Sequence, residues 1–332
     1  MKIAFVHSHP IKVKSDGVRS QALTWKEGLE SLGHQVVLVN MWDKNDWESF
    51  DIVQFFSFSE YMADLVHYLS GIGVKVSIAP IFDPNNSISI LKFYAHWGSL
   101  KLRLSNSYYQ FRNVRNLINI CLVRSEFEKK YIIACFGIPE QKCKVVPLSY
   151  RIEPNNTDMQ RKDFCLHISL LADKRKNVKR LIEAAKKYNF RLVLAGMLRN
   201  ESEQKLLNDW IGNAQNIEYK GFLSDRQMVE LYSQARVFAL PSLNEGVGIV
   251  ALEAAAMGCD VVLTSLGGPK EYYSDLAKVV NPYRVDEIGC AITDFLQGDT
   301  FQPRLKEIVK ERYSKATIAK RLEAVYMIIS NE

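Results

Sequence analysis

Two patterns of hydrophobic positions alternate along the chain. Short runs of apolar residues predict buried strands, and between the runs apolar residues recur every three or four positions, as in helices packed on a sheet. The strands are predicted at residues 2–7, 35–40, 52–56, 74–81, 118–124, 164–170, 191–196, 238–241 and 261–264. This alternation predicts parallel sheets with helices on both faces, the doubly wound α/β architecture.

The stretch after the strand that ends at Pro241 holds the most informative chemistry. A turn with Glu245, Gly246 and Gly248 leads into a helix of small apolar residues. In doubly wound sheets, ligands bind beyond the carboxyl ends of the strands, where this turn lies. Glycines let the backbone approach a ligand, and the start of a helix offers unpaired N–H groups, so the turn suits a phosphate or another anion.

Glu253 is the one charged residue on this apolar helix. Its neighbours three and four positions away are Ile249, Val250, Ala256 and Met257, and none of them carries a positive charge. A carboxylate on a buried helix needs a partner from elsewhere. That partner is either a hydroxyl group of a ligand or a structural hydrogen bond from another segment.

The spacing of Glu245 and Glu253 resembles the E-x7-E signature of the family 4 glycosyltransferases. Pro-Ser precedes the pair and Gly-Gly-x-x-Glu follows it, ending at Glu271, as in that family. Its members are retaining, nucleotide-sugar-dependent enzymes of the GT-B fold. The resemblance is strong over residues 164–300 and weaker over residues 1–120, which implies a common donor in the second domain and a variable acceptor in the first.

The resemblance implies two doubly wound Rossmann-like domains that face each other across a cleft. Residues 1–153 would form the acceptor-side domain and residues 154–306 the nucleotide-sugar-binding domain. Residues 307–332 would form a terminal helix that returns to the first domain. The polar segment from Glu153 to Asp158 is the best candidate for the linker.

The resemblance also assigns roles in the donor site. Glu245 would hold sugar hydroxyls and Glu253 the ribose, while Lys176 matches the lysine of an Arg-x4-Lys pair that binds the diphosphate. Leu171 occupies the place of the arginine, so that contact is missing or is taken over by Lys174 or Arg175. The catalytic residues would be Glu245 and Lys176, and the donor-binding residues Gly17, Arg175, Lys176, Gly196, Phe222, Gly246, Val247, Gly248, Ile249 and Glu253.

Gly17, and Asp83 as a candidate residue of the acceptor or membrane face, both depart from the family's pattern and have a structural alternative. Gly17 follows Asp16 where the family usually has Gly-Gly, and an ordinary strand-to-helix turn would explain it as well. Asp83 stands where many members place a histidine, and aspartate before proline is also a common turn-former.

Residues 91–116 interleave basic and aromatic side chains without an acidic one, including Lys101, Arg103 and Arg112. This composition suits an anionic membrane surface or a lipid-phosphate acceptor. A solvated helical hairpin is an alternative. RNA binding is a third interpretation, but no RNA-binding motif accompanies the stretch.

Composition bounds the function further. The 43 Lys and Arg residues against 37 Asp and Glu give a formal charge of +6, too mild to indicate nucleic-acid binding. The six cysteines have no metal-binding spacing, and Cys121, Cys165 and Cys259 are expected in the core. No apolar run reaches the ~20 residues of a membrane span. We expect no metal or cofactor, and a protein in the cytoplasm or peripheral to the inner face of a membrane.

The sequence thus predicts a retaining glycosyltransferase that moves a sugar from a UDP- or GDP-sugar to a hydroxyl of a saccharide or lipid-linked acceptor. Synthesis of bacterial surface polysaccharide or lipid-linked oligosaccharide is the expected setting. The alternatives are a nucleotide-sugar epimerase or hydrolase of the same fold, and a non-catalytic protein that binds sugar nucleotides. The sequence does not identify the sugar, the nucleotide or the acceptor.

Overall fold

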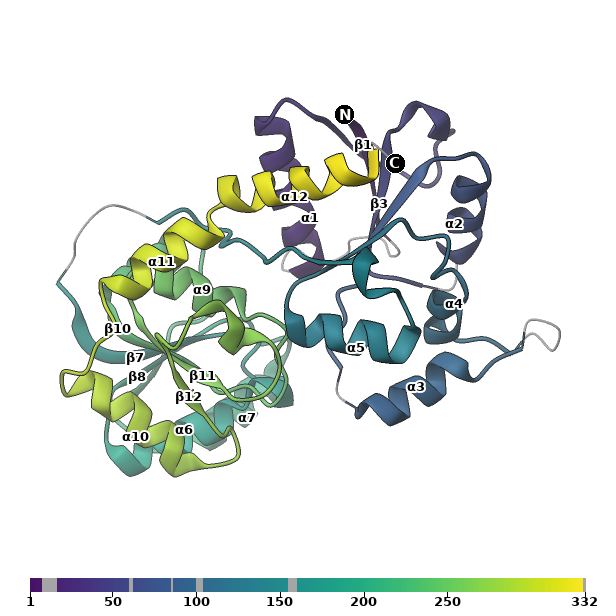
Figure 1. The fold of residues 1–332 in the computed structure, drawn as a ribbon. Helices are drawn as coiled ribbons and strands as arrows, with labels where there is room; N and C mark the ends of the chain where they lie inside the picture. Colours follow the sequence, from purple (N-terminus) through teal and green to yellow (C-terminus); the bar gives the residue numbers. More distant parts are fainter. Residues whose placement is uncertain (8–16, 60–61, 85, 100–103, 155–159, 331–332) are drawn as a thin grey trace. The chain divides into compact units, whose positions relative to one another are not determined.

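The computed structural model describes the chain except residues 8–16, 60–61, 85, 100–103, 155–159 and 331–332 (Figure 1). The chain divides into two compact units. The first unit comprises Met1–Ser149 and Lys315–Glu332, and the second comprises Tyr150–Ser314. Most of the expected linker, residues 155–159, lies outside the described residues.

The first unit is built on a six-stranded sheet of order β2-β1-β3-β4-β5-β6, in which every pair is parallel. Strands β3 and β5 are buried along their whole length, as expected for a sheet covered on both faces. The strands are β1 Lys2–His7, β2 Gln35–Leu38, β3 Ile52–Phe56, β4 Lys75–Ala79, β5 Ile120–Val123 and β6 Cys143–Val145.

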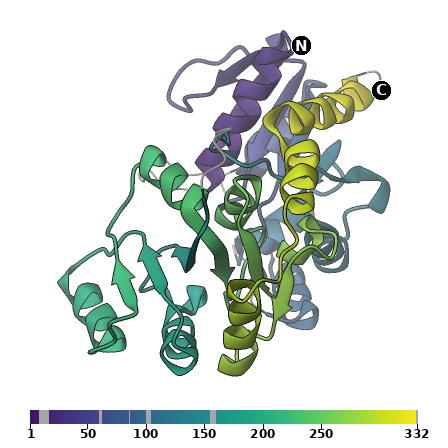
Figure 2. The same ribbon diagram turned by 90° about the vertical axis from the view of Figure 1, so that its left-hand side faces the viewer.

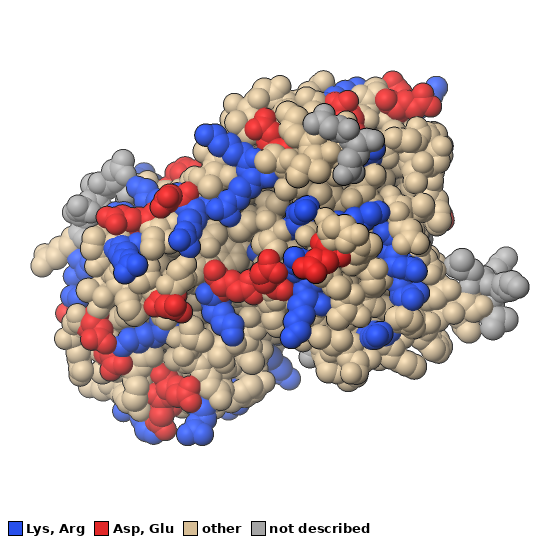
Figure 3. All heavy atoms as spheres, in the orientation of Figure 1, with Lys and Arg blue, Asp and Glu red and all other residues tan. Residues whose placement is uncertain are grey.

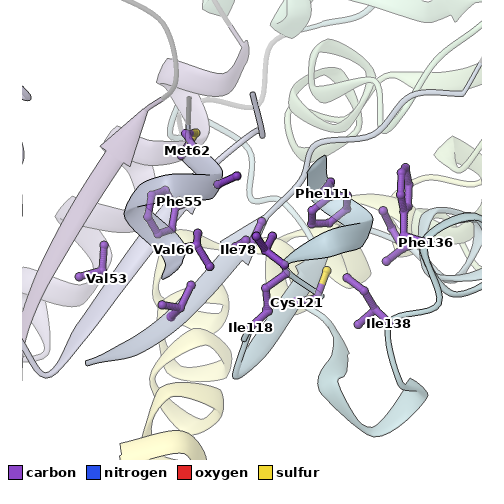
Figure 4. Packing of buried hydrophobic residues seen from close by; sticks show 14 of the residues in the cluster. Val53, Phe55, Met62, Val66, Ile78, Phe111, Ile118, Cys121, Phe136 and Ile138 are labelled. Carbon is purple, nitrogen blue, oxygen red and sulfur yellow. The ribbon is translucent and has the colours of Figure 1, made fainter. Parts of the chain in front are cut away.

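Helices from both ends of the chain complete this unit. They are α1 Gly17–Ser31, α2 Met62–Gly71, α3 Ile88–His96, α4 Ser107–Asn113, α5 Glu126–Phe136 and α12 Lys315–Ser330, with short 3-10 turns at Trp47–Ser49 and Glu140–Lys142. One cluster of buried side chains fills the space between α2, α4, α5 and the sheet, and Figure 4 shows Val66, Ile78, Phe111 and Phe136 in it. Cys121 belongs to this cluster and is fully buried, as predicted.

The C-terminal helix α12 is fixed to the first unit by close packing and by hydrogen bonds. It lies against α1 (Figures 1 and 2), where Gly28 faces Ala319 so closely that a Cβ atom at position 28 would lie 2.7 Å from the Ala319 Cβ. The buried hydroxyl of Tyr326 donates to Gln54 Oε1 at 2.7 Å. Residues 307–332, expected as one helix, contain the end of α11 (Arg304–Tyr313) and then α12, because Ser314 between them has an extended backbone.

The second unit repeats the architecture, with parallel pairs and the order β12-β11-β10-β7-β8-β9. Its strands are β7 Lys162–Ile168, β8 Leu192–Ala195, β9 Ile217–Tyr219, β10 Ala235–Leu240, β11 Asp260–Thr264 and β12 Lys278–Val280. Its helices are α6 Val178–Tyr188, α7 Glu201–Ile211, α8 Asp225–Gln234, α9 Ile249–Ala256, α10 Val285–Leu296 and α11, with 3-10 turns η3 Lys174–Lys176 and η4 Pro269–Tyr272.

Local sequence explains where these helices begin and which face they bury. Helix α8 starts with a capping box, in which Ser224 and Gln227 satisfy each other's backbone N–H groups. Helix α6 buries Val178, Leu181 and Ile182 on one side and leaves its lysines on the other. Cys165 and Cys259 are fully buried in this unit, as predicted.

The strand order of the second unit reverses between β7 and β10. The chain runs outward from β7 to β8 and β9, and then returns to place β10 on the other side of β7. The loops after β7 and β10 therefore lead to helices on opposite faces, which leaves a crevice beyond the carboxyl ends of these two strands. Any ligand site of this unit is expected at that point.

The packing of α1 on α12 yields a stability prediction. Gly28→Ala should lower the free energy of unfolding by about 1–3 kcal/mol, because the new methyl group would overlap Ala319. Gly71→Ala is the matched control, since that helical glycine has no atom within 4 Å of an added Cβ and alanine favours a helix. Urea unfolding of both variants would measure the difference. Equal stabilities would contradict this account of the α1–α12 contact.

Candidate functional site

An ion pair joins the two loops at the strand-order reversal. Lys176 ends the 3-10 turn η3 after β7, and its Nζ lies 2.6 Å from Oε2 of Glu245 in the loop after β10. The Ser242 hydroxyl donates to the same oxygen at 3.3 Å. Both charged side chains are only partly exposed, so the pair is less screened than one on an open surface. The structure thus brings together two residues that the sequence assigned to one site.

Asn177 holds these loops in place. It adopts the left-handed conformation between η3 and α6, and its Nδ2 donates to the carbonyl oxygens of Pro241 at 2.9 Å and Pro282 at 2.7 Å. The backbone N–H of Leu243 adds a hydrogen bond to the Arg175 carbonyl at 2.7 Å. The loops after β7, β10 and β12 are therefore tied to one another by buried polar contacts.

At two positions on this edge of the sheet, the backbone conformation requires glycine. Gly248 precedes α9 with a φ of +75°, and no side chain caps the helix there. Gly196, after β8, has a φ of +133°, and a Cβ atom there would lie 1.8 Å from the carbonyl oxygen of Ser169. Gly246 and the buried Val247 precede Gly248, and Ile249 begins the helix. Helix α9 begins after the loop that follows β10. Its first N–H groups, which have no partner within the helix, therefore lie near the carboxyl end of that strand.

Two predicted donor-binding residues, Gly196 and Phe222, also lie on neighbouring loops. The N–H of Gly196 donates to the carbonyl of Gly221 at 2.9 Å, which places the loop after β8 beside the loop after β9. Phe222 follows Gly221, and its ring is 69% exposed. A flat, exposed aromatic face beside a close backbone turn is suited to stacking with a planar ring.

Glu253 is 1% exposed and has protein partners in the second unit. Its Oε1 accepts the backbone N–H of Arg151 at 3.3 Å and lies 3.5 Å from the Arg151 Nε. The Tyr232 hydroxyl donates to Oε2 at 3.4 Å. Burial raises the pKa of Glu253 to about 7, and Arg151 acts in the opposite direction. Of the two partners left open by the sequence, the structural hydrogen bond is present.

Arg151 is a residue of this site that the sequence did not reveal. Its Nη1 also donates to both carboxylate oxygens of Asp225 at 2.8 Å, so the guanidinium joins Asp225 at the start of α8 to Glu253 on α9. No motif in the sequence singles out this arginine. Spacing alone cannot pair side chains that are 102 positions apart.

The place of the missing arginine is part of the core. Leu171 is fully buried, so no cation from that position reaches the site. Arg175 pairs with Asp173 at 2.7 Å and is half exposed, and Lys174 is exposed. Of the three cations in this turn, Lys176 is the one whose ion pair reaches the loop after β10.

Two polar atoms near Glu245 lack a hydrogen-bond partner among the described residues. They are Nδ2 of Asn244, in the loop itself, and the hydroxyl of Tyr273, which follows η4. Burial raises the pKa of Tyr273 well above its ordinary value, and the nearby Glu245 adds to this. A ligand with hydroxyl groups would supply the hydrogen bonds that these atoms lack.

The predicted residues of the first unit have different surroundings. Asp83 accepts from Arg124 Nη2 at 2.6 Å, and Arg124 also pairs with the buried Glu128 at 2.9 Å, so Asp83 belongs to a structural ion-pair cluster. Gly17 is the exposed first residue of α1, and residues 8–16, which precede it, lie outside the described residues. Lys101 and Arg103 also lie outside the described residues. Arg112, on α4, is partly buried.

None of the described helices is long and apolar enough to cross a membrane. Within the described ranges, no three His, Cys, Asp or Glu side chains gather closely enough to form a candidate metal site.

Comparison with known proteins agrees with this geometry. Residues 154–312 match the family described as Glycosyl transferases group 1. O-antigen chain mannosyltransferase B of Escherichia coli is 25% identical over 246 residues, which is 69% of this chain and 61% of that protein. This chain thus spans less than two thirds of that relative's length.

Solved structures resemble the chain over nearly its whole length. Sucrose-phosphate synthase of Thermosynechococcus elongatus has a TM-score of 0.74 at 14% identity and covers 99% of this chain and 98% of its own. Anabaena HepE, in complex with UDP and glucose, has a TM-score of 0.72 at 15% identity and covers 99% of this chain and 100% of its own.

These likenesses confirm the predicted GT-B fold, with two Rossmann-like units built on parallel six-stranded sheets. Residues 154–312, just under half of the chain, are thus similar to the group 1 glycosyltransferase family. The matched region contains Lys176, Glu245 and Glu253.

The burial of Glu253 predicts how stability depends on pH. Its folded-state pKa of about 7 lies above the ordinary 4.5, so the folded protein binds this proton more tightly than the unfolded chain does. The resulting stabilisation is fully present below about pH 4.5 and is lost as the pH rises through about 7. Glu253→Gln cannot titrate and should remove this dependence.

Chemical unfolding between pH 5 and 8 would measure this effect. The stability of the wild type relative to Glu253→Gln should fall by about 1.4 kcal/mol for each pH unit between about pH 5 and 7. Glu230→Gln, a change to an exposed glutamate on α8, is the control and should leave the pH dependence unchanged. A constant difference between wild type and Glu253→Gln would show that Glu253 does not titrate in this range.

Proposed function

We propose that the chain is a retaining glycosyltransferase that transfers a sugar from a nucleotide-sugar donor to an acceptor hydroxyl. The Lys176–Glu245 pair carries this proposal, because it lies at the strand-order reversal of a unit that matches a glycosyltransferase family. The donor would be a UDP- or GDP-sugar. The complex of HepE with UDP and glucose and the mannosyltransferase relative support these two choices.

The chemistry of the leaving group explains why a cation is needed here. Breaking the bond between the sugar and the diphosphate places negative charge on the phosphate oxygens. A fixed cation and helix-end amides favour this developing charge over the ground state. Lys176 would supply the cation, and the first N–H groups of α9, after Gly248, would supply the amides. Such a site requires no metal ion.

Glu245 would have two tasks in this reaction. In the structure it neutralises Lys176, so a bound diphosphate would share or displace that pair. Its carboxylate would then accept hydrogen bonds from sugar hydroxyls and fix the orientation of the sugar. Asn244 Nδ2 and the Tyr273 hydroxyl, which have no hydrogen-bond partner within the described part of the chain, are suited to the same hydroxyl-rich ligand. Attack from the side of the leaving group would retain the anomeric configuration.

Glu253 would bind the ribose hydroxyls, but only with the cooperation of Arg151. The carboxylate accepts hydrogen bonds best when ionised, and burial opposes ionisation at neutral pH. Arg151 favours the ionised form of this carboxylate, and the hydroxyl of Tyr232 donates a further hydrogen bond to it. Phe222 and the backbone at Gly196 would border the base.

The acceptor would be a saccharide or a lipid-linked saccharide, bound by the first unit. The O-antigen relative supports a role in surface polysaccharide or lipid-linked oligosaccharide synthesis. We place the protein in the cytoplasm, or peripheral to the inner face of a membrane.

A thermal-shift screen with UDP-, GDP- and ADP-sugars, in the presence of EDTA, tests the proposed function. A cognate donor should raise the melting temperature by mass action, and product analysis with oligosaccharide acceptors should then show transfer with retention. Glu245→Ala should lower turnover by about 100-fold or more while leaving the melting temperature of the free protein nearly unchanged. Glu230→Ala, in the same unit, should retain full activity.

Three results would contradict the proposal. They are the absence of stabilisation by every sugar nucleotide, hydrolysis of the donor with epimerisation and no transfer, and near-full activity of Glu245→Ala. The second result would indicate the epimerase or hydrolase alternative.

The pH dependence of donor binding tests the role of Arg151. Affinity for the cognate sugar nucleotide should increase as the pH rises through about 7, because Glu253 then becomes ionised. In Arg151→Met the transition should move to higher pH, since the cation that favours the carboxylate is gone. Titration calorimetry between pH 6 and 9 would measure this. An affinity that is constant with pH in both proteins would exclude Glu253 as the ribose ligand.

A further inference from the structure

Helix α3 of the first unit has an apolar stripe on its exposed side. Ile90, Phe93, Tyr94 and Trp97 are 47%, 62%, 44% and 51% exposed. Their spacing of three, four and seven positions places them on one side of a helix. Leu91 and Ala95, on the other side, are buried in the core. The helix therefore has two apolar sides, and the protein covers only one of them.

The stripe is held on a fixed support. Asn106, which caps the start of α4, donates from Nδ2 to the carbonyl oxygens of Tyr94 at 3.2 Å and Trp97 at 3.0 Å, at the end of α3. The rings of Tyr94 and Tyr108 stack at 6.4 Å. Gly98 packs under the ring of Tyr109, where a Cβ atom would overlap it at 2.6 Å. The aromatic side chains are thus presented outward by a packed helical pair.

The charge around the stripe has one sign. Residues 84–125 contain six Lys and Arg and no Asp or Glu, which leaves 37 Lys and Arg against 37 Asp and Glu in the rest of the chain. The formal charge of +6 thus equals the excess of this one segment. Arg124 is paired in the core, whereas Lys92 is exposed on α3. In the view of Figure 3, the surface over α3 carries no Asp or Glu atoms.

We propose that the α3 stripe, Ile90, Phe93, Tyr94 and Trp97, docks the first unit onto an anionic lipid bilayer. Aromatic and aliphatic side chains enter the boundary between headgroups and acyl chains, while neighbouring cations contact the headgroup phosphates. A second copy of this chain fits the surface less well, since pairing the stripes would bring two positive segments together. The surface lies in the first unit, so the donor site of the second unit does not depend on it.

The chain contains a matched control surface. Met41 and Trp42 are 53% and 96% exposed in the first unit, so they offer comparable apolar area, but Asp43 follows them directly. Lys44, also exposed, corresponds to Lys92. Changes at positions 41–44 therefore remove exposed apolar or basic groups without changing the α3 stripe.

Sedimentation with vesicles of phosphatidylcholine, alone or mixed with phosphatidylglycerol, tests the proposal with the full chain. The wild type should bind the anionic vesicles, and binding should weaken as salt is raised. Phe93→Ser with Trp97→Ser should reduce the partition coefficient by about tenfold or more. Lys92→Glu should reduce binding to anionic vesicles. The two controls, the double variant Met41→Ser with Trp42→Ser and the single variant Lys44→Glu, should each bind like the wild type.

Melting temperatures show that each variant is folded, and light scattering reports the oligomeric state. Wild-type binding by Phe93→Ser with Trp97→Ser, or an equal loss in the 41–42 variant, would overturn the proposal. The proposal would also be overturned if the wild type did not bind vesicles but formed a dimer that dissociates in the variant with Phe93→Ser and Trp97→Ser. That last result would identify a second copy as the partner. Donor stabilisation should be unchanged in all variants, which separates this test from that of the proposed function.

Discussion

The side-chain amide of Asn177 is the contact on which the arrangement of the second unit's loops depends. Its two hydrogen bonds fasten the loop after β7 to the carbonyl groups of Pro241 and Pro282. The parallel sheet brings the carboxyl ends of neighbouring strands to one edge, but it does not fix the loops that follow them. Asn177 does so, and the adjacent Lys176 is thereby held where it meets Glu245. The hydrogen bonds of the Asn177 side chain thus set the position of the charges.

The buried carboxylate of Glu253 shows the cost of placing a charged group inside this unit. Removing a carboxylate from water disfavours its ionised form, and the pKa of about 7 reflects that cost. Arg151, Tyr232 and the backbone offset part of it. Arg151 lies close to the start of the second unit, at Tyr150, so the first residues of the unit also complete its site. A change in this short segment would therefore alter the chemistry of α9.

The sequence predicted the fold well because the fold depends on local patterns. Long apolar strands such as β3 and β7 were recognisable, whereas β6, β9 and β12 are three residues long and too short to show periodicity. The resemblance assigned Lys176 and Glu245 to one donor site, since both positions match motifs, whereas their ion pair is visible only in the structure. Arg151 could not be predicted, because its pairing with Glu253 depends on how distant segments meet. Asp83 likewise required the structure, which shows its pairing with Arg124.

Helix α3 illustrates why composition and structure answer different questions about one segment. The mixture of basic and aromatic residues in 91–116 was visible in the sequence and favoured an acceptor or membrane face, but it left a solvated hairpin as an alternative. In sequence, Leu91 and Phe93 are both apolar residues of one helix. Only packing separates them, because Leu91 is covered by the core while Phe93 is not. Apolar area that the fold leaves uncovered, in a segment of the sequence whose charged residues are all basic, is the combination that favours a lipid surface over water. The physical basis for the docking surface is therefore this difference in burial within a single helix.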